Sequence, residues 1–198
     1  HGRCHQECHG LRGGGRVRIN YVVEDFSVFR YIGCATVARM IYRNMPRDAD
    51  LDLSWNSARR DVDIAHFHTF GPLALGYRTY TKGVKVLTAH STPHTNLGNI
   101  GFSGLINSLY PPIYRGFDHI ITVSDPCDRD IRAMLPGMET TMIPNGVDRR
   151  IFQRYGDKRR AFRAALGADE DETVVLTLGQ QTPRKGIYDF LELAARIP

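Results

Sequence analysis

Residues 62–89 read VDIAHFHTFGPLALGYRTYTKGVKVLTA, and their pattern is the clearest sign of the fold class. Two short apolar runs, 62–67 and 84–89, have the length of buried strands. Between them, residues 71–83 have a helical pattern that we expect to end at Gly83. Parallel strands need a long crossover connection, which is usually a helix. The stretch therefore predicts one strand–helix–strand unit of a parallel sheet.

The same alternation continues on both sides of this unit. Residues 33–45 place Val37, Met40 and Ile41 on one helical face. Residues 100–116 contain two adjacent prolines, which should break any helix there because proline lacks the amide hydrogen. Further strands are expected at 17–23, 51–55, 119–123, 140–144 and 173–179, and further helices at 128–135 (capped at Ser124), at 157–166 and from about Gly186. The sequence therefore predicts an α/β fold, a Rossmann-like and mostly parallel sheet with helices on both faces.

The composition is that of an ordinary globular chain. Of 198 residues, 42% are apolar and 24% are charged, and 26 Lys and Arg against 21 Asp and Glu give a net charge of +5. These values exclude disordered, collagen-like and membrane-spanning chains, and the charge is too mild to indicate nucleic acid as a partner. Without a secretory signal a cytoplasmic protein is expected. The four cysteines are too few for a disulfide scaffold, so reduced thiols are expected.

Residues 1–16, HGRCHQECHGLRGGGR, differ in character from the rest of the chain. They have no apolar periodicity and so cannot pack a face against a core. Two explanations are open: a metal or haem site, or a disordered leader foreign to a protein that begins near Val17. The side chains available to a metal are His1, Cys4, His5, Cys8 and His9. Three residues separate the two cysteines, whereas zinc-finger and haem motifs use two, so we favour the foreign leader.

Polar residues follow most of the expected strands. They are Glu24 and Asp25, His66 and His68, His90, Ser124, Asn145, and residues 180–185. Ligands of parallel α/β sheets bind outside the carboxyl ends of the strands. We therefore expect one edge of the sheet to carry the chemistry.

Four segments together resemble the N-terminal half of a retaining glycosyltransferase with the GT-B fold, from glycosyltransferase family four. They are DIAHFHTFGPLA (63–74), KVLTAHSTPHT (85–95), HIITVSDPCDRDI with MIPNGVDRRIF (119–131 and 142–152), and LTLGQQTPRKGIYDFLELA (176–194). The resemblance implies an acceptor-side Rossmann-like domain over 17–148 and a linker with a helix over 149–172. It also implies that residues 173–198 are the first strand and helix of a truncated donor-binding domain.

The resemblance assigns donor binding to one turn and one glycine. Lys185 stands where the family has the lysine that faces the diphosphate leaving group. Gln180 takes the place of a family arginine, and Arg184 would supply the missing charge. Gly33 matches one member of a glycine pair that lets the backbone approach a phosphate. The alternatives are a solvated basic turn for residues 180–185 and an ordinary helix start for Gly33.

His90 directly follows an expected strand and matches the active-site histidine of the family's N-terminal domain, which contacts the transferred sugar. As the catalytic residue it would hydrogen-bond a sugar hydroxyl or stabilise positive charge that develops on the sugar ring. The residues assigned to the cleft or the acceptor are His66, His68, Ser91, His94 and Asn145. His66 and His68 share one face of a strand, a spacing also compatible with packing or with metal. The resemblance argues against a metal.

Two surface segments have alternative interpretations. Residues 101–117, GFSGLINSLYPPIYRGF, form either a helix buried on the sheet, which we favour, or a segment that touches a membrane surface. Residues 148–163, DRRIFQRYGDKRRAFR, are basic but poor in aromatic residues. A solvated linker helix is favoured there over a nucleic-acid site.

The resemblance implies transfer of a sugar from a nucleotide-diphosphate donor to a carbohydrate or lipid-linked hydroxyl, with retention of configuration and without a cofactor or metal. The expected location is the cytoplasm, with peripheral membrane contact as a possibility. A competing hypothesis is a non-catalytic domain that binds a nucleotide sugar or glycan, and a third is an epimerase-like enzyme. The family's donor domain carries two Glu with seven residues between them, and no such pair occurs in this sequence. These 198 residues are therefore not expected to catalyse transfer alone.

Overall fold

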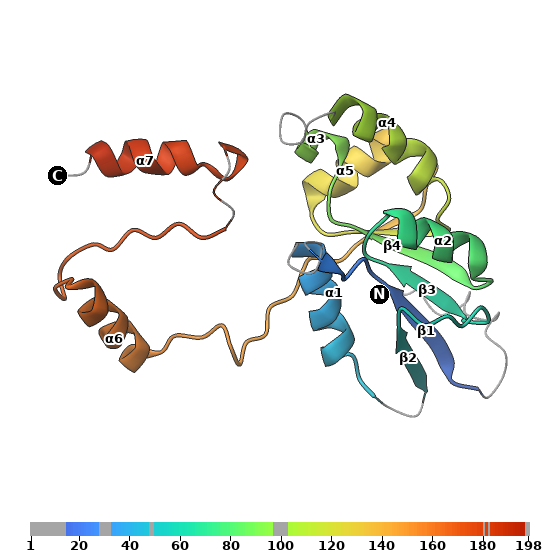
Figure 1. The fold of residues 1–198 in the computed structure, drawn as a ribbon, viewed down its shortest axis with the longest axis horizontal. Helices are drawn as coiled ribbons and strands as arrows, with labels where there is room; N and C mark the ends of the chain where they lie inside the picture. Colours follow the sequence, from blue (N-terminus) through green and yellow to red (C-terminus); the bar gives the residue numbers. More distant parts are fainter. Residues whose placement is uncertain are drawn as a thin grey trace, which may run out of the picture. The chain divides into compact units, whose positions relative to one another are not determined.

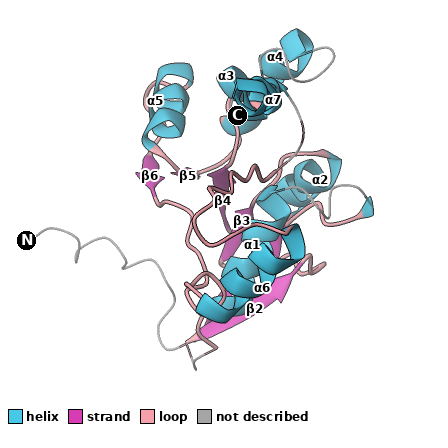
Figure 2. Cartoon of the chain, turned by 90° about the vertical axis from the view of Figure 1, so that its left-hand side faces the viewer, coloured by secondary structure: helices cyan, strands magenta, loops and turns pink. Residues whose placement is uncertain are grey.

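A computed structural model of the chain describes residues 15–27, 33–47, 50–96, 103–179, 181 and 183–196. The described chain divides into two compact units, with the boundary between Asn145 and Gly146. In each unit helices alternate with loops or strands, as the colours of Figure 2 show. Among the described residues, no helix is both long enough and apolar enough to cross a membrane. Residues 1–14 of the expected leader, which include the side chains considered for the alternative metal site, lie outside the described part.

The first unit is built on a six-stranded sheet, counted over the described residues, with the order β2-β1-β3-β4-β5-β6. The strands are β1 (Val17–Val22), β2 (Leu51–Trp55), β3 (Ile64–Phe67), β4 (Val84–Ala89), β5 (His119–Thr122) and β6 (Thr140–Met142). All five pairings are parallel, which confirms the predicted sheet. The order places β2 on one side of β1 and every later strand on the other. The chain therefore reverses its direction of travel across the sheet between β1 and β3.

Helices cover both faces of this sheet, as predicted (Figure 1). Helix α1 (Gly33–Asn44) packs Ala35 and Ala38 against Val23 and Trp55 on one face. The opposite face carries the larger apolar cluster, to which α2 (Pro72–Tyr80), α4 (Ser103–Tyr114) and α5 (Asp125–Met134) contribute. Because successive side chains of a strand point to opposite faces, Phe67 enters this cluster while His66 points toward the α1 side.

Helix α1 is confirmed, but its buried face differs from the predicted one. The fully buried residues are Ala35 and Ala38, whereas Val37, Met40 and Ile41 are only partly buried. Small side chains allow the helix to approach the sheet closely beside the rings of Trp55 and Tyr21, which occupy much of the space on this face.

The prediction that a helix over 100–116 must break is wrong for the described residues, because α4 runs from Ser103 to Tyr114 with Pro111 and Pro112 inside it. Tyr110 and Tyr114 of this helix are almost completely buried in the core. Burial of two aromatic side chains is worth more than the two amide hydrogen bonds that the prolines remove. The predicted packing of this segment on the sheet is confirmed.

Gly83 has a role other than the predicted one of ending α2. The helix ends at Tyr80, and the amide of Thr81 still donates to the carbonyl oxygen of Tyr77. Gly83 instead lies against the backbone of Val62, just before β3. A Cβ atom at Gly83 would lie 2.2 Å from the carbonyl oxygen of Val62. Only glycine allows this close approach of two backbones.

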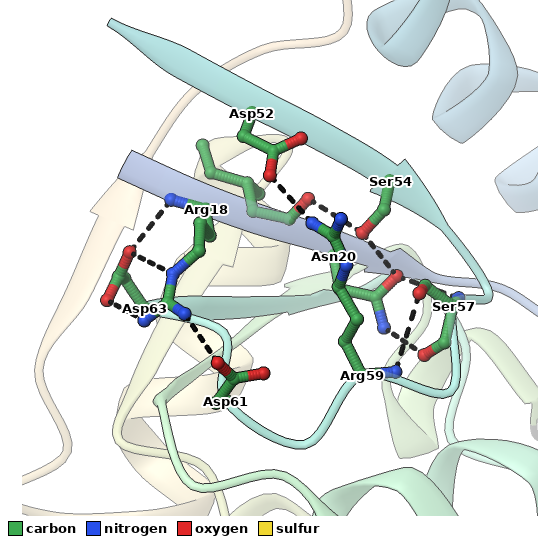
Figure 3. Close-up of polar contacts among 9 residues, drawn as sticks. Arg18, Asn20, Asp52, Ser54, Ser57, Arg59, Asp61 and Asp63 are labelled. Carbon is green, nitrogen blue, oxygen red and sulfur yellow. Dashed lines mark hydrogen bonds and ion pairs between the residues drawn. The ribbon is translucent and has the colours of Figure 1, made fainter. Parts of the chain in front are cut away.

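A polar network ties β1 to the loop that follows β2 (Figure 3). The buried amide of Asn20 donates to the carbonyl oxygen of Ser57 at 3.0 Å and accepts from the Ser57 amide and the Ser54 hydroxyl. Arg18 bridges Asp61 and Asp63. These bonds hold residues 57–63 against β1 and so fix where β3 begins.

The second unit contains α6 (Gly156–Leu166), the short 3-10 helix η2 (Pro183–Lys185) and α7 (Ile187–Arg196). The two predicted helices are confirmed, but the predicted strand over 173–179 is absent, and Figure 1 shows this segment as loop. Its apolar side chains are exposed, Leu178 by 84%. A strand needs the amide and carbonyl groups of a neighbour, and no described residue of this unit forms a strand beside it.

Replacing Gly83 with alanine should lower the free energy of unfolding by about 1–3 kcal/mol, because the added methyl group overlaps a backbone oxygen that cannot rotate away. Gly76→Ala in α2 is the matched control, since a Cβ atom there meets no atom within 4 Å. That variant should gain up to about 1 kcal/mol from helix propensity. Urea denaturation measures both, and a Gly83 variant as stable as the parent would contradict the close approach.

Candidate functional site

The point where the chain reverses direction, between the carboxyl ends of β1 and β3, is where parallel α/β sheets place their ligands. Glu24 lies just past β1, and His68 lies just past β3. The amide of His68 donates to the carbonyl oxygen of Val22 at 3.2 Å, so the two strand ends remain joined there. His90 follows β4, the next strand in the sheet. The predicted gathering of strand-end residues is therefore present around β1, β3 and β4.

Five rings form a row across the α1 side of the sheet. They belong to Trp55, Tyr21, His66, His68 and His90, and come from β2, β1, β3 and β4 or the residues just after them. Ring centroids are 5.1 Å apart for Tyr21 and His66, 4.4 Å for His66 and His68, and 5.4 Å for His68 and His90. This ring row packs the three predicted histidines into one cluster.

Hydrogen bonds fix the orientation of each imidazole in the cluster. His66 Nε2 lies 2.8 Å from the Thr88 hydroxyl oxygen. His68 Nδ1 lies 3.1 Å from His90 Nε2, so one ring donates to the other. His68 is only 2% exposed, whereas His66 and His90 are partly buried. Among the described residues, His90 is therefore the member of the cluster that follows its strand and still reaches the surface.

Burial keeps these imidazoles uncharged. It lowers the pKa of His90 to about 4, and burial together with the neighbouring His90 lowers the pKa of His66 to about 4. The pKa of His68 falls well below its ordinary value because of burial, with smaller contributions from His66 and His90. A neutral imidazole has one donor and one acceptor nitrogen, so the cluster can hydrogen-bond neutral hydroxyl groups.

Glu24 holds the loop that follows His68. Its carboxylate accepts hydrogen bonds from the amides of Gly71, at 3.0 Å, and Leu73, at 3.1 Å, which are at the start of α2. Its own amide donates to the hydroxyl oxygen of Thr69 at 3.0 Å. A carboxylate at a helix N-terminus is stabilised by the unpaired amides there. A Cβ atom on Gly71 would lie 2.2 Å from this carboxylate, so glycine leaves room for it.

The loop after β4 is anchored to two helices of the opposite face. Ser91 bonds through its hydroxyl to the Tyr110 hydroxyl at 2.9 Å, and its carbonyl oxygen accepts from Tyr114. His94, whose side chain is 76% exposed, pairs with Asp130 of α5 at 3.2 Å, and Thr92 donates to the same carboxylate. Ser91 therefore positions the backbone beside His90, and His94 contacts Asp130 rather than the histidine cluster.

The remaining predicted site residues are placed less directly. Gly33 is the first residue of α1, where a Cβ atom would meet nothing within 4 Å. Asn145 is exposed beyond the carboxyl end of β6. Lys185 is exposed in η2 of the second unit. Gln180 and the side chain of Arg184 lie outside the described part, so the donor-binding assignment stays a prediction.

Sequence reasoning missed Tyr21, Thr88 and Asn56 as parts of this site. Tyr21 and Thr88 complete the ring row and its hydrogen bonds. Asn56 donates to and accepts from the backbone of Val23, both at 2.9 Å, and so acts as a strand partner beyond the end of β1. The alternation of side chains gives the face of each residue, but only the strand order shows which faces are neighbours.

Chemically, the cluster is a set of neutral hydrogen-bonding rings at the ligand edge of the sheet. Within the described ranges, no group of three or more His, Cys, Asp or Glu side chains is arranged to hold a metal ion. His66 and His68 instead have hydrogen-bond partners in Thr88 and His90. The arrangement suits recognition of a polar, uncharged ligand.

The stability of the protein should fall as the pH drops from about 6.5 toward 4. An unfolded histidine has a pKa near 6.5, whereas His66 and His90 titrate near 4 in the fold. Between these values unfolding takes up protons, so the free energy of unfolding is highest above about pH 6.5 and is lost on acidification. Urea denaturation across this range measures the slope.

His66→Gln should flatten that slope by about one proton. Equal slopes for the His66 variant and the parent would show that this imidazole is not held neutral by the fold.

Glu24→Gln should cost about 1.5–3 kcal/mol, because an amide nitrogen would replace one of two charged acceptors that face backbone N–H groups. Hydrogen exchange of the Gly71 and Leu73 amides should accelerate in parallel. Glu139→Gln, at a side chain that is 87% exposed, serves as the control and should change stability by less than about 0.5 kcal/mol. Unchanged exchange at Gly71 would argue against the proposed anchoring.

Comparison with known proteins agrees with this architecture. The model of the Glycosyltransferase Family 4 matches residues 17–150. The chain is also 27% identical over 146 residues to the alpha-galactosylglucosyldiacylglycerol synthase of Streptococcus pneumoniae, an alignment that covers 70% of this chain and 39% of that protein. It therefore spans less than half the length of this relative. With a family match over most of the chain and the α/β sheet of a GT-B N-terminal domain, the protein belongs to glycosyltransferase family 4.

Proposed function

We propose that this chain provides the acceptor-side half of a retaining glycosyltransferase, which moves a sugar from a nucleotide-diphosphate donor to a carbohydrate or lipid-linked hydroxyl. The observation that carries the proposal is the neutral histidine cluster at the point where the parallel sheet reverses direction. Ligands of such sheets bind at that edge, and neutral imidazoles suit sugar hydroxyls. Membership of glycosyltransferase family 4 supports sugar transfer in general.

His90 is the group of this cluster that would touch the sugar. It follows β4 and is partly exposed, while one of its nitrogens is held by His68. Its loop is anchored through Ser91 to Tyr110 and Tyr114, both buried in the core. A rigidly supported hydrogen-bonding group orients a substrate at little entropic cost at the moment of reaction.

The donor would be held through its diphosphate by the turn of the second unit. Lys185 is exposed there, next to the start of α7. A cation and helix-terminal amides stabilise the negative charge that grows on a departing diphosphate. Under this proposal the chain's own residues supply charge stabilisation and positioning, with no metal or cofactor.

Of the two acceptor classes, we favour the lipid-linked one, because the name of the similar bacterial protein describes a diacylglycerol glycolipid as its product. Helix α4 exposes Leu105 by 66% and Leu109 by 48% while it buries Tyr110 and Tyr114. Exposed leucines on a helix whose other face packs on the sheet suit peripheral contact with a lipid surface.

Binding of a simple saccharide tests the proposal. We expect methyl α-glucoside or methyl α-galactoside, added at millimolar concentration to the isotope-labelled chain, to shift the NMR signals of His90, Ser91 and Thr88. His90→Ala should weaken this binding about tenfold, the effect of one lost hydrogen bond. His119→Ala is the matched control. His119 is the first residue of β5, so it lies at the amino end of its strand, away from the carboxyl ends where the site lies, and it contacts Thr141.

Two outcomes would contradict the proposed site. One is the absence of any shift with both glycosides and with short glycosyl glycerols. The other is binding that His90→Ala and His119→Ala affect equally, because the saccharide would then be recognised elsewhere.

A further inference from the structure

The hydrogen bond between His68 and His90 can run in either direction, depending on which ring carries the proton between them. The two facing atoms, His68 Nδ1 and His90 Nε2, are 3.1 Å apart. Both rings are neutral at neutral pH, so each carries a single N–H group. If His68 donates, its Nε2 is a bare acceptor and His90 carries its proton on Nδ1. If His90 donates, His68 has its only proton on Nε2.

The surroundings of His68 Nε2 decide between these two states. This atom is buried and has no hydrogen-bond partner among the described residues. Around it lie the rings of His66 and Tyr21, whose centroids are 4.4 and 6.0 Å from that of His68. A buried N–H group without a partner is rarer and more costly than a buried acceptor without one. The proton of His68 therefore belongs on Nδ1, where His90 accepts it.

We propose that His68 is a positioning residue that holds His90 in the tautomer with its proton on Nδ1, so that His90 presents an N–H donor to the ligand. Among the described residues His90 Nδ1 has no hydrogen-bond partner, and His90 is partly exposed, so Nδ1 is the ring nitrogen left for a ligand. The inference rests on the proposed function for the identity of that ligand, a sugar.

The assignment defines what His90 recognises. A ring whose Nε2 already accepts from His68 and whose Nδ1 carries a proton has no free acceptor nitrogen. It donates to a hydroxyl oxygen of the substrate, and it cannot take the proton of an acceptor hydroxyl. His90 is thus a sugar-binding donor and not a general base.

The experiment is ¹⁵N NMR of the histidine ring nitrogens in the full chain, near pH 7.5 and without ligand. Protonated and bare imidazole nitrogens have well-separated shifts, so each ring reports its own tautomer. We expect a proton on Nδ1 and a bare Nε2 in His68, and a proton on Nδ1 of His90. A proton on Nε2 of His68 in the parent protein would overturn the inference.

Two variants test whether His68 determines the state of His90. Asparagine can place an amide N–H near the position of Nδ1, whereas leucine cannot donate. His68→Asn should keep the His90 proton on Nδ1, and His68→Leu should release it to a mixture of tautomers. If both variants leave His90 in the same state, the role of His68 is only structural, which contradicts the proposal.

The saccharide titration gives an independent functional measure. His68→Leu should weaken binding about tenfold and His68→Asn should restore most of it, because only the second variant keeps the donor on His90. The ring-nitrogen spectra need no sugar. If the chain binds no saccharide but shows the expected tautomers, the proposed function fails while the assignment of His90 stands. If the chain binds saccharide but His68 carries its proton on Nε2, the assignment fails while the proposed function stands.

Discussion

The parallel pairing of β3 with β1 on one side and β4 on the other determines which side chains meet at the ligand edge of the sheet. In this register Tyr21 is the partner of His66, and the Thr88 hydroxyl lies within hydrogen-bonding distance of the same ring. A shift of β3 by one residue would turn His66 and His68 into the apolar cluster and expose Phe67 on the other face. Burial of Phe67 therefore holds the histidines in place.

Contacts within the fold hold the side chains of the site in place. Imidazoles are tolerated on this side of the sheet because they stay neutral and are hydrogen-bonded to Thr88 or to one another. Glu24 is a charged group in the same region, and the amides at the start of α2 satisfy its carboxylate. Polar groups that are held in this way keep a fixed geometry, which lowers the entropic cost of binding.

The sequence was sufficient to predict features that depend on local patterns. Strand-end positions and two-residue spacing predicted that His66, His68 and His90 would share one edge, and Ser124 was correctly predicted as a helix cap. Features that depend on distant neighbours were beyond it. Pro111 and Pro112 stay helical because Tyr110 and Tyr114 find a core, and residues 173–179 form no strand because no described residues pair with them.

The two units differ in the kind of chemistry their described residues offer. The histidine cluster of the first unit is uncharged, and the carboxylate of Glu24 lies in the same region. Exposed Lys185 belongs to the second unit. Under the proposed function, the cluster recognises sugar hydroxyls and Lys185 stabilises the charge of the diphosphate. A neutral cluster then has an advantage, because positive charge next to the sugar would oppose the positive charge that develops on its ring as the bond to the diphosphate breaks.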